Sequence, residues 1–134
     1  MSAAAAPTVY IIDDDDSVRA AIAGLLKAVG LRSESFAAPE EFLRSKRLGG
    51  PSCVVLDVRL SGVSGLDVER KLASAGIQIP IIFITGQDEI PMAVQKAMKA
   101  GAVDLLTKPF LDQDLLDAIQ RALDRYRVEP ASGE

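Results

Sequence analysis

The sequence contains no histidine and no tryptophan, and it has a single cysteine, Cys53. Without histidine, nucleophilic triads of the serine–histidine type are excluded, and so are most zinc sites. One cysteine cannot form an intramolecular disulfide. Because Cys53 opens an apolar run and no histidine is available to activate a thiolate, we expect a buried and unreactive thiol.

Long hydrophobic runs and an excess of positive charge are also missing. Although 49% of the 134 residues are apolar, no run reaches the roughly 18 residues needed to cross a bilayer. The start, MSAAAAP, has neither a basic region nor an apolar stretch of signal-peptide length, so we expect a disordered lead over residues 1–7 and a cytoplasmic location. The net charge is −4 and there is no basic stripe, which predicts no direct binding of nucleic acid by this chain.

Short apolar segments alternate with segments of helical periodicity along the chain. Length predicts one domain, over residues 8–127, followed by a tail or linker start at 128–134. Strands are expected at 8–12, 32–36, 53–56, 79–85 and 102–107, and helices at 18–29, 39–47, 65–75, 91–100 and 115–126. This order predicts an α/β fold, a (βα)5 doubly wound parallel sheet of five strands in the order 2-1-3-4-5.

Polar residues stand where four of the predicted strands end. Asp13 and Asp14 follow the first strand, Asp57 ends the third, Thr85 ends the fourth, and Lys108 follows the fifth. In such sheets ligands bind beyond the carboxyl ends of the strands, where the strand order reverses. We therefore expect these five side chains to converge. Each signal is weak alone, but their agreement is a strong signal.

The three carboxylates would repel one another unless a cation compensates them. A hard divalent ion suits such oxygen ligands, and Mg²⁺ keeps waters that a phosphate can displace. A carboxylate can also attack phosphorus and form an acyl phosphate, whose oxygens Lys108 and Thr85 could stabilise. Asp15 and Asp16, by contrast, are expected to cap the following helix.

These residues resemble the receiver domain of two-component response regulators, over about residues 9–126. The matching segments are VYIIDDDDSVR, VVLDVRLSGVSG, IIFITGQDEIPMAVQKAMKAGAVD and KPF. The chain closely resembles the FixJ-like subgroup found in nitrogen-fixation regulators, which is often fused to a helix-turn-helix DNA-binding domain. The resemblance implies a flavodoxin-like fold and a signalling role, in the control of an output domain or of transcription, and not metabolic catalysis.

For the acidic residues, the resemblance implies that Asp57 accepts a phosphoryl group from a sensor histidine kinase. It further implies that Asp14, Asp57 and the backbone carbonyl of Arg59 ligate Mg²⁺ directly. Asp13 would act through a metal-bound water. The domain would catalyse its own phosphorylation and slow dephosphorylation.

For the remaining residues, the resemblance implies that Thr85 is the switch hydroxyl and Lys108 the cation that pairs with phosphate. The Lys108–Pro109 peptide bond is expected to be cis, which X-Pro bonds permit. Phosphorylation is expected to favour a homodimer through the surface formed by residues 91–100, 102–107 and 115–126.

Three positions depart from the usual receiver pattern. Ser61 stands where proline is usual, four residues after the phosphoacceptor, and Leu105 replaces the usual aromatic switch residue. The stretch 85–101 is one residue longer than usual, as an extended loop or as a bulge in the helix.

Three other interpretations share parts of this pattern. A flavodoxin-like flavin binder has the same architecture, but four consecutive aspartates would repel the flavin phosphate. A phosphatase of the haloacid dehalogenase type needs an aspartate two residues after its nucleophile, where this chain has Arg59. A structural interaction domain that keeps the fold without phosphorylation is the third.

Overall fold

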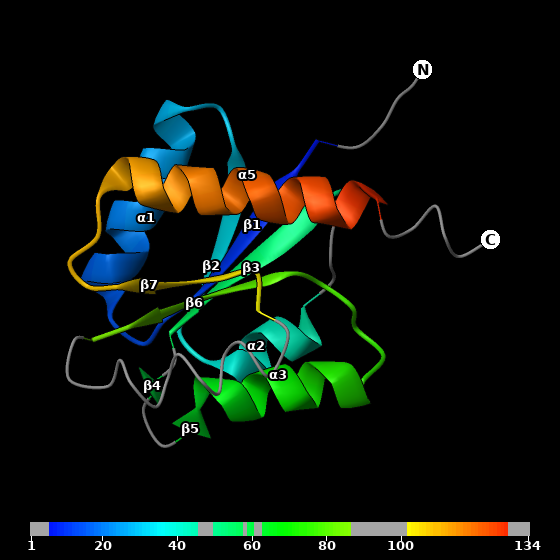
Figure 1. The fold of residues 1–134 in the computed structure, drawn as a ribbon. Coiled ribbons are helices and arrows are strands. Elements are labelled where there is room, and N and C mark those ends of the chain that lie inside the picture. Colours follow the sequence, from blue (N-terminus) through cyan, green and yellow to red (C-terminus); the bar gives the residue numbers. More distant parts are fainter. Residues whose placement is uncertain (1–5, 46–49, 58, 61–62, 87–101, 129–134) are drawn as a thin grey trace.

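The structure, a computed structural model, describes residues 6–45, 50–57, 59–60, 63–86 and 102–128 (Figure 1). Five parallel strands form one sheet in the order β2-β1-β3-β6-β7, which is the predicted 2-1-3-4-5 order. The strands are β1 (Thr8–Ile12), β2 (Arg32–Phe36), β3 (Ser52–Asp57), β6 (Ile81–Thr85) and β7 (Asp104–Thr107). The expected helix at 91–100 lies outside the described residues.

Helices cover both faces of the sheet (Figure 1). On one face lie α1 (Asp16–Ala28) and α5 (Asp112–Val128), and on the other lie α2 (Pro39–Arg44) and α3 (Gly65–Ser74). Strands β1, β3 and β6 are buried along their whole length, as continuous apolar runs predict for strands covered on both faces. No helix in the described part of the chain is long and apolar enough to cross a membrane.

The core divides into two apolar clusters, one on each side of the sheet. The cluster under α1 and α5 includes Ile22, Leu26 and Ile119, and also Cys53 of β3. The opposite cluster contains three neighbouring aromatic rings, with Tyr10 and Phe42 5.1 Å apart between ring centroids. Burial of this apolar surface, at roughly 25 cal/mol per Å², holds the sheet and its strand ends in place.

Helix α1 begins two residues before its expected start at 18 and ends one residue before its expected end at 29. The Asp15 side chain accepts hydrogen bonds from the backbone N–H groups of Ser17 at 2.8 Å and Val18 at 3.4 Å, which confirms the expected N-cap. Asp16 lies in the first turn, where an acidic side chain suits the helix dipole. Beyond the helix, Gly30 adopts a φ of 81°, a conformation that glycine accommodates best.

Several boundaries differ from the sequence-based prediction. β6 begins at Ile81 and not at Ile79. Proline lacks a backbone donor, and Pro80 contributes only its carbonyl, which accepts a hydrogen bond from Val54 N at 2.9 Å. A short antiparallel pair, β4 (Arg59–Leu60) with β5 (Val63–Ser64), was not predicted because two-residue strands leave no periodic signal.

Candidate functional site

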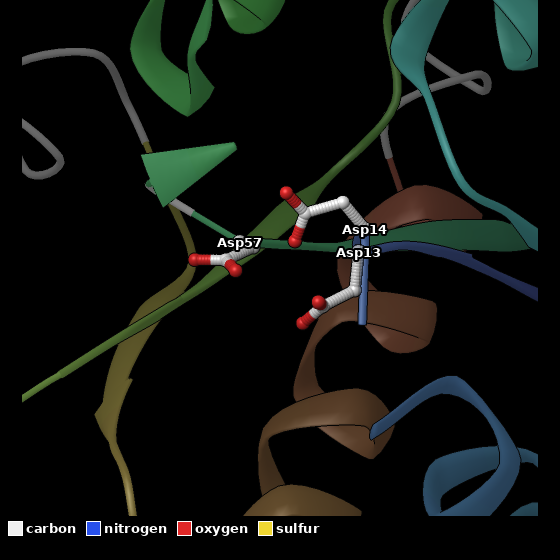
Figure 2. A group of neighbouring side chains, drawn as sticks. All are labelled: Asp13, Asp14 and Asp57. Atoms are coloured by element: carbon white, nitrogen blue, oxygen red, sulfur yellow. The ribbon is translucent and has the colours of Figure 1, made fainter. Parts of the chain in front are cut away.

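The acidic residues predicted from the strand ends do come together. One carboxylate oxygen from each of Asp13, Asp14 and Asp57 lies within 4.8 Å of the others. Figure 2 shows the three side chains gathered where β1 and β3 end. The cause is the topology: β1 and β3 pair in parallel, with Ile12 opposite Leu56, so the next residues meet at one edge.

The three carboxylates differ in exposure. Asp13 and Asp57 are buried, with 2% and 7% of their surface exposed, whereas Asp14 is exposed. Burying a carboxylate is unfavourable unless it is hydrogen-bonded or paired with a cation. The site must therefore compensate the two inner groups, and Asp14 forms its solvent-facing side.

Asp13 is held in place by its neighbours. Its Oδ1 accepts a hydrogen bond from Asp15 N at 2.9 Å, and its own N–H donates to the Phe36 carbonyl at 3.2 Å. Its backbone carbonyl accepts a hydrogen bond from Arg19 Nη1 at 2.6 Å. Sequence reasoning missed Arg19, because a contact to a backbone carbonyl depends on the shape of the β1–α1 turn.

Lys108 supplies the positive charge at the centre of the site. Its Nζ lies 3.7 Å from Oδ2 of Asp57 and 3.7 Å from Oδ2 of Asp13. The backbone delivers it there, since Lys108 N donates to the Thr85 carbonyl at 2.8 Å beyond the β6–β7 pairing. The Lys108–Pro109 bond is cis, as expected.

Thr85 is fully buried at the end of β6. Its hydroxyl donates a hydrogen bond of 3.3 Å to the Gly86 carbonyl. On the neighbouring strand, Asp57 lies opposite Ile84, so Thr85 stands one residue beyond the level of Asp57. Thr85 thus belongs to the same sheet edge as the carboxylates.

The donor set fits a hard divalent cation. Oδ2 of Asp13 is buried and accepts no hydrogen bond from the described residues, although Lys108 lies near it. An acceptor in that position, beside two more carboxylates, suits an oxygen-seeking ion such as Mg²⁺ or its bound water. Arg59, whose backbone carbonyl was the other predicted ligand, lies two residues beyond Asp57 in β4.

Of the three sequence departures, Ser61 lies outside the described residues, and so does most of the longer stretch 85–101, of which only 85 and 86 are described. The third, Leu105, is half-buried on β7 opposite Phe83 and packs against the core cluster that contains Tyr10 and Phe42. Cys53 is fully buried, and burial raises the pKa of its thiol to about 12. Its predicted burial in the core is confirmed.

The sequence and the fold agree with those of known proteins. The family model for the response regulator receiver domain matches residues 9–120. The response regulator protein TmoT of Ectopseudomonas mendocina is 52% identical over 115 residues, which cover 86% of this chain and 52% of TmoT. The chain therefore spans about half the length of this relative.

Two solved structures extend the comparison. The response regulator StyR is 42% identical, with a TM-score of 0.86 over 96% of this chain and 64% of that one. The structure FixJ-N is 39% identical, with a TM-score of 0.80 over 92% of this chain and 96% of that one. Sequence and fold thus agree, and the chain belongs to the response regulator receiver domain family of two-component signalling proteins, whose receiver domains are signalling domains and not classical enzymes.

Proposed function

We propose that this chain receives a phosphoryl group on Asp57 from a sensor histidine kinase, in a reaction that requires Mg²⁺. The observation that carries the proposal is the cluster of Asp13, Asp14 and Asp57 within 4.8 Å, with Lys108 Nζ 3.7 Å from Asp57. The test is whether a small phosphodonor modifies Asp57 alone. The proposal describes a cytoplasmic signalling domain that catalyses its own phosphorylation and its slow dephosphorylation.

Asp57 is the proposed nucleophile. Its carboxylate oxygen attacks phosphorus, a new O–P bond forms, and the P–N bond to the donor histidine breaks as that imidazole recovers a proton. Burial of Asp57 keeps bulk water away from the acyl phosphate that results. Hydrolysis by water later returns the free carboxylate and inorganic phosphate.

Lys108 and Thr85 stabilise the charge of the phosphoryl oxygens in this proposal. The Lys108 ammonium already lies beside Asp57, so it is in position to pair with a phosphoryl group attached there. Thr85 presently donates to Gly86, and its hydroxyl must exchange that 3.3 Å bond for one to the phosphoryl oxygen. Through this change of hydrogen-bond acceptor, phosphorylation of the site would alter β6 and the loop that follows it.

The proposed ligands of Mg²⁺ are Asp14, Asp57 and the Arg59 backbone carbonyl. Asp13 would act through a metal-bound water. When bound, Mg²⁺ supplies positive charge that offsets the carboxylates and the incoming phosphoryl oxygens. The buried Oδ2 of Asp13 supports this assignment, because it has no described hydrogen-bond donor of its own.

The proposed partners are a sensor histidine kinase and a second copy of this chain. A groove of about 230 Å³ lies between α1 and the β7–α5 connection, lined mainly by apolar side chains and by Lys108. This groove would offer the kinase an apolar contact surface next to Lys108, whose ammonium lies beside Asp57. Dimerisation through β7, α5 and the segment 91–100 would follow phosphorylation and control an output domain that regulates transcription.

A further inference from the structure

Arg19 makes a short hydrogen bond to the backbone of the acidic turn. Its Nη1 donates to the carbonyl oxygen of Asp13 at 2.6 Å, in a partly buried position. A guanidinium donor makes this hydrogen bond charge-assisted, and such bonds are roughly twice as strong as neutral ones. Arg19 thus ties the first turn of α1 back to the end of β1.

The carbonyl that Arg19 holds belongs to the peptide unit between Asp13 and Asp14. A peptide unit is planar, so fixing the direction of its oxygen also fixes the direction in which the chain enters Asp14. The other side of Asp13 is already fixed by its N–H bond to Phe36 and by the bond from Asp15 N. The Arg19 bond therefore completes the alignment of the two consecutive carboxylates.

The α1 helix does not need this side chain for its own start. Asp15 supplies the N-cap through its side chain, and the backbone N–H of Arg19 makes the ordinary helical bond to the Asp15 carbonyl at 3.1 Å. The guanidinium is then available for the turn that precedes the helix.

We propose that Arg19 is a positioning residue for the metal site: it holds the Asp13–Asp14 peptide so that both carboxylates face Asp57. This inference rests on the proposed function, since it assumes that these carboxylates hold Mg²⁺. It assigns no contact between Arg19 and the ion or the phosphoryl group.

The direction of the effect separates positioning from charge. Arg19 is a cation close to a cation site, so if it acted by charge alone, its removal would strengthen Mg²⁺ binding. If it acts by positioning, its removal weakens Mg²⁺ binding, because Asp14 is no longer directed toward Asp57. Mutation of a residue that orients metal ligands typically lowers the metal affinity by about 10–100-fold, and we expect Mg²⁺ affinity to fall about tenfold here.

The experiment compares the full chain with Arg19→Met, which keeps an apolar stem without donors, and with Arg19→Lys, which keeps the charge. The matched control is Arg44→Met, an exposed arginine at the end of α2 on the opposite face of the sheet. The Mg²⁺ dissociation constant is measured by calorimetric titration, and phosphorylation by phosphoramidate is measured across Mg²⁺ concentrations.

We expect Arg19→Met to bind Mg²⁺ about tenfold more weakly, Arg19→Lys to lie between it and wild type, and Arg44→Met to match wild type. At saturating Mg²⁺ the phosphorylation rate of Arg19→Met should return to near the wild-type value. Unchanged or tighter Mg²⁺ binding in Arg19→Met overturns the inference, and if that variant does not fold, the same criterion applies to Arg19→Lys. A wild-type chain that neither binds Mg²⁺ nor accepts phosphate would instead overturn the proposed function.

Discussion

Nζ of Lys108 lies 3.7 Å from Oδ2 of Asp57. The same ammonium lies 3.7 Å from Asp13, whose side chain is only 3% exposed, while the lysine side chain is 35% exposed. One partly exposed cation therefore offsets two buried carboxylates.

Replacing Lys108 should separate its role in phosphorylation from that of the metal. In Lys108→Met, phosphorylation by phosphoramidate should slow by about 100-fold, the range seen when one charge-stabilising donor is removed. Mg²⁺ should bind more tightly, because a competing cation has gone. Lys27→Met, an exposed lysine in the last turn of α1, is the control and should behave as wild type. A Lys108→Met chain phosphorylated at the wild-type rate would remove Lys108 from the mechanism.

Mg²⁺ should stabilise the folded chain, because the proposed carboxylate site for the ion is present in the native chain and not in the unfolded one. At ten times its dissociation constant, the gain in unfolding free energy is about 1.4 kcal/mol, measurable as a rise in melting temperature. Asp14→Ala should lose most of that rise. The exposed Asp114→Ala in the first turn of α5 should keep it. A wild-type melt that does not respond to Mg²⁺ would argue against a metal site.

Much of this site was predictable because it depends on few rules. Continuous apolar runs predicted β3 and β6, and the parallel order brought Asp13, Asp14 and Asp57 to one edge. Pairs such as Lys108 with Asp57 follow from the same register. The strand ends and the position where the strand order reverses are enough to predict where this site lies.

The contacts that could not be predicted depend on local geometry. Nothing in the spacing of Arg19 indicates that its side chain turns back to the Asp13 carbonyl and not to solvent. The late start of β6 follows from Pro80, and the short β4–β5 pair has too few residues to carry a pattern. These features arise from turns, where a shift of one residue changes every contact.

The buried Cys53 thiol should make the free energy of unfolding fall at alkaline pH. Its pKa is raised by burial from 9.0 to about 12, so above pH 9 the unfolded chain loses a proton that the folded chain retains. Fewer protons on the unfolded state mean that stability falls as pH rises, and it is fully present below pH 9. Between pH 8 and 10.5, wild type should lose about 2 kcal/mol more unfolding free energy than Cys53→Ala. Parallel curves for the two proteins would contradict the expected shift.

Leu105 should weaken the link between the phosphorylated site and the protein surface. Leucine has no flat ring or hydroxyl to exchange between water and a buried position, so its alternative positions differ little in buried area. A ligand shifts an equilibrium only through its differential interaction with the two states. With a beryllium fluoride phosphate mimic, sedimentation should give a larger gain in dimer affinity for Leu105→Phe than for wild type. Equal gains would mean that loop movement alone transmits the signal.

Phosphorylation of Asp57 is the central claim, and intact-mass analysis tests it most directly. The chain is treated with phosphoramidate and Mg²⁺, and the modified residue is located by fragmentation after reduction of the acyl phosphate. We predict one added phosphoryl group on wild type, located at Asp57, and none on Asp57→Ala. The control Asp117→Ala, an exposed carboxylate on α5, should be modified like wild type. A phosphoryl group that persists on Asp57→Ala would contradict the assignment.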